Sequence, residues 1–259
     1  MEALYIAAFA LLGVAVGSFL NVCIDRLPDN MSIISPPSRC AACQKRLSAR
    51  DLIPVLSYLW LRGRCRYCEA AISGRTLWVE ISSGAAFALL YWHYGLSAEL
   101  TVTAFYFCLF LVILVIDLEK LIVMPVIVIL GLIAAIVFSI FIAESLLVPV
   151  LTKAAIGGAT GLGIFLVIYL VAFVIYRGKG FGLGDVYIGV LMGFALGFPN
   201  VIVGILLSFW IGGITAIVLV VLKLRGMKQA VPLGVFLSLG TMATLLWGAN
   251  ILDWYLGYF

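Results

Sequence analysis

The sequence GFGLGD at residues 180–185 opens an apolar segment in which Asp185 is the only charged residue before Gly197. Gly189, Gly193 and Gly197 follow Asp185 at intervals of four, so on a helix all four share one face. Glycines stacked in this way let a neighbouring helix approach closely, and an acid at the edge of a membrane segment commonly has a function. We expect Asp185 to face such a helix. The alternative is a packing stripe with an acid at its N-terminus, where negative charge is favoured.

The composition is that of a polytopic membrane protein. Of the 259 residues, 65% are hydrophobic and 11% are charged, and the mean hydropathy is +1.23. The formal charge of +4 is small, and the basic residues lie between apolar segments, which argues against a nucleic-acid partner. Residues 3–24 are too long and too evenly apolar for the hydrophobic region of a signal peptide, so we interpret them as a first span.

Eight apolar segments are close to the ~20 residues that cross a bilayer as a helix. They are residues 3–24, 76–94, 99–117, 122–143, 154–176, 185–198, 201–222 and 232–251. We therefore expect an all-α polytopic membrane protein with about eight transmembrane helices. Residues 1–28 would hold the first helix, residues 29–75 a small cytosolic insertion, and residues 76–259 a core of seven helices.

The positions of lysine and arginine predict the orientation. Nine of the sixteen lie in residues 26–75, and six more follow the third, fifth and seventh spans. With eight spans these fifteen share one side, against Lys153 alone on the other, so the positive-inside rule places residues 26–75 in the cytosol. The third span then ends at Asp117 and the sixth begins at Asp185 on that same face. The two carboxylates can therefore be close in space.

Four of the six cysteines form two C-x-x-C pairs, CAAC at residues 40–43 and CRYC at residues 65–68. Two such pairs suit a closed tetrahedral Zn²⁺ site, whose role would be to fold a small zinc-ribbon-like domain. The alternatives are two disulfides or four buried thiols, and a cytosolic location disfavours disulfides. The predicted metal ligands are Cys40, Cys43, Cys65 and Cys68. We interpret Cys23 and Cys108, which lie in apolar runs, as packing residues.

Several motifs in this order resemble the type IV prepilin peptidases, and together they extend over nearly the whole chain. They are GSFLNV at 17–22, RLP at 26–28, the paired cysteine motifs around IPVLSYL at 53–59 and LRGRC at 61–65, ISGR at 72–75 followed by Glu80, IDLE at 116–119 followed by Pro125, and GLGD at 182–185. One departure is Tyr187, at a position where the family commonly has lysine. The proline after the first aspartate also lies about one residue later than usual.

The resemblance implies an intramembrane aspartic protease with Asp117 and Asp185 as its catalytic pair. Such an enzyme removes the basic leader of prepilins or pseudopilins at the cytosolic face of the bacterial inner membrane. Many members also N-methylate the new terminal amine with S-adenosylmethionine. Two carboxylates held close together share a proton, so one can act as general base on water while the other polarises the scissile carbonyl. The sequence does not say which aspartate does which.

Three further residues are candidates for substrate binding. Gly182 and Gly184 lack a Cβ and could let the substrate backbone approach the acids, although they could also belong to a flexible loop between helices. Glu80 lies inside the second predicted span, where an acid needs a partner. That partner could be a substrate amine or an arginine.

Two other classes of function compete with the peptidase. A proton-coupled transporter also uses paired intramembrane acids, but its acids usually lie near the bilayer midplane, often between repeated halves. Here both acids are predicted at one face, and no repeat is visible. The third class is a zinc-containing assembly factor without catalytic activity. The sequence predicts membrane lipid as a partner and leaves the oligomeric state open.

Overall fold

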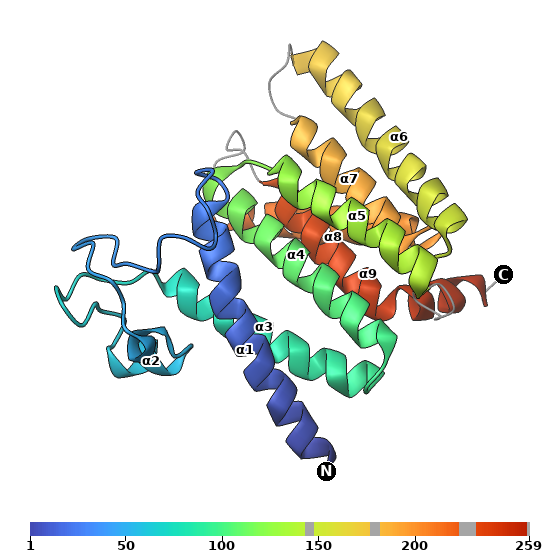
Figure 1. Cartoon of the computed structure of the whole chain (residues 1–259). Helices are drawn as coiled ribbons and strands as arrows, with labels where there is room; N and C mark the ends of the chain where they lie inside the picture. The colour runs from blue at the N-terminus through green and yellow to red at the C-terminus, as the bar shows by residue number, and fades with distance from the viewer. Residues whose placement is uncertain (143–147, 177–181, 223–231, 258–259) are drawn as a thin grey trace. The chain divides into compact units, whose positions relative to one another are not determined.

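The computed structural model describes the chain except residues 143–147, 177–181, 223–231 and 258–259. Within these described ranges the chain forms nine α-helices and one short 3₁₀ helix (Figure 1). The α-helices are α1 (Glu2–Arg26), α2 (Leu56–Trp60), α3 (Gly74–Tyr94), α4 (Ala98–Lys120), α5 (Pro125–Phe141), α6 (Leu151–Tyr176), α7 (Leu183–Leu196), α8 (Asn200–Val221) and α9 (Leu233–Leu256), and the 3₁₀ helix η1 is Ala49–Leu52.

Each of the eight predicted apolar segments corresponds to one helix. Five helices in the described ranges, α1, α4, α6, α8 and α9, are long and apolar enough to cross a membrane, which confirms a polytopic membrane protein. Helices α5 and α7 are apolar but shorter, with 17 and 14 residues. The break between α4 and α5 lies at Leu121, whose φ is 55°, and Pro125 then begins α5 at a position where its missing N–H has no cost.

The chain forms two compact units, Met1–Leu100 and Thr101–Phe259. In the first unit α1 and α3 pack side by side and antiparallel (Figure 1). A Cβ added at Gly17 would lie 2.8 Å from the Cα of Glu80, so the two backbones touch there. One turn further along, the Asn21 side chain donates to the carbonyl of Thr76 at 3.0 Å. These contacts pair Gly17 with Glu80 and Asn21 with Thr76 across the hairpin.

In the second unit the glycine stripe of α7 is covered by α6. A Cβ at Gly157 would overlap the Gly193 backbone, and a Cβ at Gly161 would overlap the Gly189 backbone. Such backbone-to-backbone contact requires glycine on both helices. The predicted close approach of a neighbouring helix along this stripe is therefore confirmed, and the neighbour is α6.

Candidate functional site

Asp117 lies in the last turn of α4 and is buried, with 6% of its surface exposed. Its Oδ2 atom has no hydrogen-bond partner among the residues that the structure describes. Gly234, in the first turn of α9, packs directly against this carboxylate, because a Cβ added there would lie 2.7 Å from Oδ2. A buried acid with an unpartnered oxygen is costly for folding and therefore marks a candidate functional site.

Asp185 lies in the first turn of α7 and is half-buried. Its backbone N–H donates to the carbonyl of Gly182 at 3.2 Å, which closes the turn that leads into the helix. The carboxyl group of Asp185 is near enough to Asp117 for the two to interact electrostatically. The two acids that the sequence singled out, from helices far apart in the chain, are thus brought together.

Contacts around the two acids show how three helices converge. Val123, six residues after Asp117, lies against the start of α7, because a Cβ at Gly184 would be 2.7 Å from its Cγ2 atom. A Cβ at Gly234 would also lie 2.8 Å from Cδ1 of Ile188, one turn into α7 from Asp185. The ends of α4, α7 and α9 therefore meet at the acid pair.

The two candidate glycines have different surroundings. Gly184 packs against Val123, so its missing Cβ serves contact within the protein rather than an open path to the acids. Gly182 has an extended backbone and is exposed, and a Cβ there would meet no atom closer than 3.7 Å. Tyr187 is also exposed. Residues 180–181 of the GFGLGD motif lie outside the described residues.

The four cysteines of the two C-x-x-C pairs lie together in the first unit. Their sulfur atoms are all within 4.8 Å of one another, and the Cys40 and Cys68 sulfurs are 3.8 Å apart. Hydrogen bonds from the backbone amides of Cys43 and Ala42 lower the pKa of Cys40 to about 6. The cluster could hold a metal ion.

The two cysteine loops have the same backbone design. In the first loop, the N–H of Cys40 donates to the carbonyl of Lys45, and the N–H of Gln44 donates to the carbonyl of Cys40. In the second loop, the N–H of Cys65 donates to the carbonyl of Ala70, and the N–H of Glu69 donates to the carbonyl of Cys65. Gln44 and Glu69, each four residues after the first cysteine of its pair, have φ of 57° and 58°. Each loop thereby curls its backbone around the sulfurs, and the loops end in isolated β-bridges.

Glu80 is buried in α3, where it has a partner that sequence reasoning did not foresee. Its Oε2 atom accepts a hydrogen bond of 2.7 Å from the backbone N–H of Val55. Arg75, a nearby arginine on α3, instead forms an ion pair with Asp25 at 2.5 Å. In the structure the Glu80 carboxylate therefore ties the loop before α2 to α3.

Sequence reasoning did not single out Gly234, and it gave Asn21 only as part of the GSFLNV motif, without a contact. The clue at Gly234 is that it follows Pro232-Leu233 at the start of an apolar segment. Glycine has a low helix propensity, so its presence in a helix suggests a packing reason. The clue at Asn21 is a polar residue within the apolar part of the first segment. In neither case does spacing along the sequence identify the partner.

Two family models match the chain. The Bacterial Peptidase A24 N-terminal domain matches residues 11–94, and the Type IV leader peptidase family matches residues 104–217. The first match contains Glu80 and all four cysteines of the cluster. The second contains Asp117 and Asp185.

Several curated relatives carry the name prepilin leader peptidase/N-methyltransferase. The Aeromonas hydrophila protein is 31% identical over 99% of this chain and 95% of its own length, and the Aeromonas salmonicida protein is 30% identical over 98% and 94%. The Myxococcus xanthus protein is 34% identical over 70% of this chain, a match that spans 53% of that relative. No solved structure matches. The resemblance seen in the sequence is confirmed, and the chain belongs to the type IV leader peptidase family.

Proposed function

We propose that this chain is an aspartic endopeptidase that removes the leader peptide of type IV prepilins or pseudopilins and then N-methylates the new terminus. Its relatives carry both activities in their name. The observation on which the proposal rests is the pair of acids, Asp117 and Asp185, at the meeting point of α4, α7 and α9. Two interacting carboxyl groups can hydrolyse a peptide bond without a metal or a covalent nucleophile.

In the proposed mechanism the two aspartates share one proton. The ionised carboxylate removes a proton from a water molecule, which attacks the scissile carbonyl carbon, while the protonated carboxyl group donates a hydrogen bond to the carbonyl oxygen. The resulting tetrahedral intermediate collapses when a proton passes to the leaving amine. The open surroundings of Gly182, beside Asp185, make it the better of the two glycines for contact with the substrate backbone.

The proposed topology has eight spans, with the acid pair and the cysteine cluster facing the cytosol of a bacterial cell. Support comes from the lysines and arginines, fifteen of which lie on one side if all eight predicted apolar segments cross. Residues 29–75 would then be a cytosolic domain inserted between α1 and a peptidase core at residues 76–259. A prepilin would present its leader to the site from water while its hydrophobic segment stays in lipid.

We propose structural zinc for the cysteine cluster. At a Zn–S distance of about 2.3 Å, a tetrahedral site places its sulfurs roughly 3.8 Å apart. The observed separation of 3.8 Å between the Cys40 and Cys68 sulfurs fits this geometry. A site closed by four sulfurs has no position for substrate, so its role is to fold the insertion. S-adenosylmethionine would supply the methyl group for the second activity.

The decisive experiment uses the purified full-length protein in detergent with a prepilin-like peptide that contains the leader and the start of the hydrophobic segment. Wild-type protein should release the leader, and the single variants Asp117→Asn and Asp185→Asn should each release none. Normal cleavage by either variant would refute the carboxylate-pair mechanism. Transport activity without cleavage would instead favour the transporter class.

A methyl-transfer assay with labelled S-adenosylmethionine, run on the chemically synthesised mature peptide, tests the second activity separately. Because the proposed mechanism uses the two acids for hydrolysis only, label should appear on the terminal amine with wild-type protein and with both aspartate variants. If the wild-type protein transfers no label, the chain is a peptidase only.

A further inference from the structure

The short helix α2 carries an exposed apolar face. Leu56, Leu59 and Trp60 follow the spacing i, i+3 and i+4, which places them on one side of the helix, and they are 64%, 58% and 86% exposed. The opposite side is turned toward the protein, where Tyr58 lies close to Gly63 and Gly74. The helix therefore presents three large apolar side chains outward from a polar domain.

The depth of α2 follows from its attachment to α3. Val55, directly before α2, donates its N–H to Glu80, and Glu80 lies level with Gly17 of α1. Gly17 is nine residues before Arg26, the last residue of α1, which at 1.5 Å per residue is about 13 Å along that candidate span. Helix α1 is about 37 Å long against a hydrocarbon core of about 30 Å, so its end extends beyond the core, and the start of α2 lies beside the hairpin in the leaflet on the Arg26 side.

The attachment at Val55 is strongly imposed by the surrounding structure. Val55 has a φ of 61°, a conformation that is rare for a β-branched residue and persists only when its neighbours enforce it. The buried carboxylate of Glu80 provides such enforcement. The hydrogen bond thus ties the residue directly before α2 to α3.

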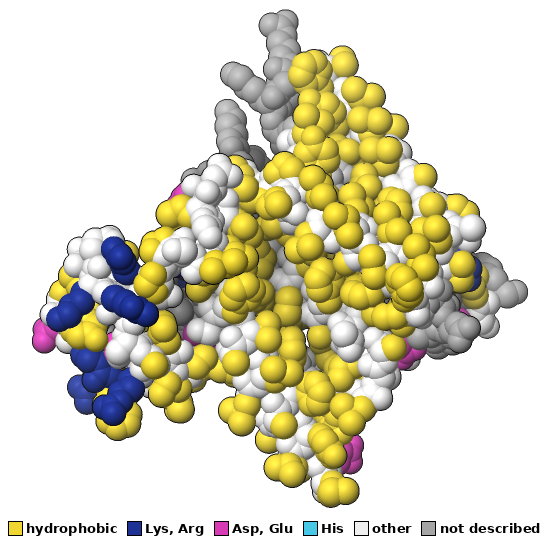
Figure 2. Space-filling view, in the orientation of Figure 1, with side chains coloured by type: hydrophobic (Ala, Val, Ile, Leu, Met, Phe, Trp, Pro, Cys, Tyr) yellow, Lys and Arg dark blue, Asp and Glu magenta, His cyan; other side chains and the backbone are white. Residues whose placement is uncertain are grey.

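The surroundings of α2 match a membrane interface. Trp78, in the second turn of α3, is 75% exposed, so it adds a second aromatic side chain of the kind that gathers at headgroup level. Residues 26–75 contain nine lysines and arginines against three acids, and in Figure 2 the dark blue side chains gather over this insertion. Basic residues around an exposed apolar helix face are typical of segments that lie in an anionic lipid surface.

We infer that α2 is an interfacial anchor, with Leu56, Leu59 and Trp60 inserted among the lipid headgroups and upper acyl chains of the leaflet that faces the insertion. The partner is the bilayer itself. The anchor fixes the cysteine domain against the membrane surface, and it does not depend on the chemistry at Asp117 and Asp185.

The test uses the full-length protein in nanodiscs that contain phosphatidylglycerol. The fluorescence of Trp60 is obtained by subtracting the emission of the variant Trp60→Phe from that of the wild-type protein. We expect this contribution to be quenched by lipid brominated near the top of its acyl chains and not by aqueous iodide. Lipid brominated near the chain ends should quench it less.

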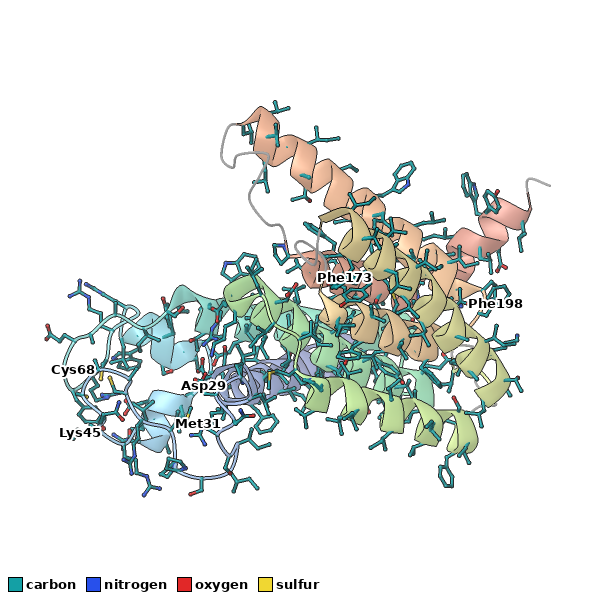
Figure 3. The ribbon with its side chains drawn as sticks, turned by 90° about the horizontal axis from the view of Figure 1, so that it is seen from above. Asp29, Met31, Lys45, Cys68, Phe173 and Phe198 are labelled. Atoms are coloured by element: carbon teal, nitrogen blue, oxygen red, sulfur yellow. The ribbon has the colours of Figure 1, made fainter. Side chains whose placement is uncertain are left out.

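A matched control places a tryptophan elsewhere on the same domain. Lys45 is exposed and lies with Cys68 at the end of the insertion away from the long helices (Figure 3). In the Trp60→Phe background, Lys45→Trp should add fluorescence that iodide quenches and brominated lipid does not.

The inference is overturned if iodide quenches the Trp60 contribution and brominated lipid leaves it unchanged, because α2 would then be in water. It is equally overturned if neither quencher acts, because protein, such as a second copy of the chain, would then cover the helix. A peptidase assay on the same Trp60→Phe sample reports separately on the proposed function.

Discussion

Replacing Gly234 by alanine tests whether α9 positions the buried acid. The added Cβ would lie 2.7 Å from Oδ2 and 3.0 Å from Cγ of Asp117, and 2.8 Å from Cδ1 of Ile188. Ordinary contacts between such atoms need roughly 3.5 Å, so the overlap is roughly half an ångström or more. If the carboxylate turns away, its position relative to Asp185 changes; if α9 retreats, Asp117 loses the packing that holds its carboxylate in place.

The magnitude follows from two effects. Overpacking a well-packed site costs about 1–3 kcal/mol of folding free energy. A 1 Å misplacement of a reacting group costs about 100-fold in rate, so a half-ångström displacement should lower kcat about 10-fold. Because the proposed substrate keeps its hydrophobic segment away from the acid pair, in lipid, KM should change by less than about threefold. Both constants are measured by peptide cleavage in detergent, and unfolding is followed in the same buffer.

The matched control is Gly248→Ala, on the same helix. Its Cβ would lie 2.6 Å from Cγ2 of Thr244, so it introduces a comparable overlap, but 14 residues, or about 21 Å, from Gly234. Gly248→Ala should lower stability without lowering kcat. The reasoning is refuted if Gly234→Ala cleaves as fast as the wild type, or if Gly248→Ala loses kcat to the same extent.

Three other predictions concern the rest of the chain. Cys40→Ser should remove zinc from the purified protein, as measured by elemental analysis, and expose residues 29–75 to proteolysis. Cys108→Ser should keep the metal. Full metal content in Cys40→Ser would contradict a four-sulfur site. Glu80→Ala should cost about 1.5–3 kcal/mol of folding free energy, because the charged hydrogen bond to Val55 is lost, and it should accelerate protease cleavage near α2. Glu80→Gln should retain an acceptor and most of the protection against cleavage. Equal cleavage of both variants would show that the bond is unimportant. Gly193→Leu should separate α6 from α7 and lower the unfolding temperature sharply, and an unchanged temperature would mean that the two backbones are not in contact.

Much of the helical architecture was predictable because apolar length alone identifies segments that can cross a bilayer. The proximity of Asp117 and Asp185 was also predictable, since the positive-inside rule predicts that the ends of their two segments share one face. The glycine stripe of α7 indicated a close neighbour, but not that the neighbour is α6. The paired cysteine motifs gave the cluster directly, because their spacing is set by local loop geometry.

The remaining features depend on contacts between distant parts of the chain. Gly234 is needed because of where Asp117 lies, and nothing in its own sequence surroundings records that position. The partner of Glu80 is a backbone N–H, which any residue other than proline carries, so no side-chain pattern could identify Val55. Gly184 illustrates the converse case, since a glycine beside a candidate catalytic acid suggests room for substrate, whereas in the structure it makes room for Val123.

The antiparallel register of α1 and α3 has a consequence for how the chain can change. Gly13, Gly17 and Asn21 meet their α3 partners directly, so the hairpin is held by its own two helices and not by the residues that join them. Doubling the length of a connecting loop costs only about 0.6 kcal/mol in closure entropy. The chain between α1 and α3 can therefore be lengthened away from Val55 without changing the alignment of the two helices, whereas a module that replaces it must also supply a hydrogen-bond donor for the buried Glu80 carboxylate.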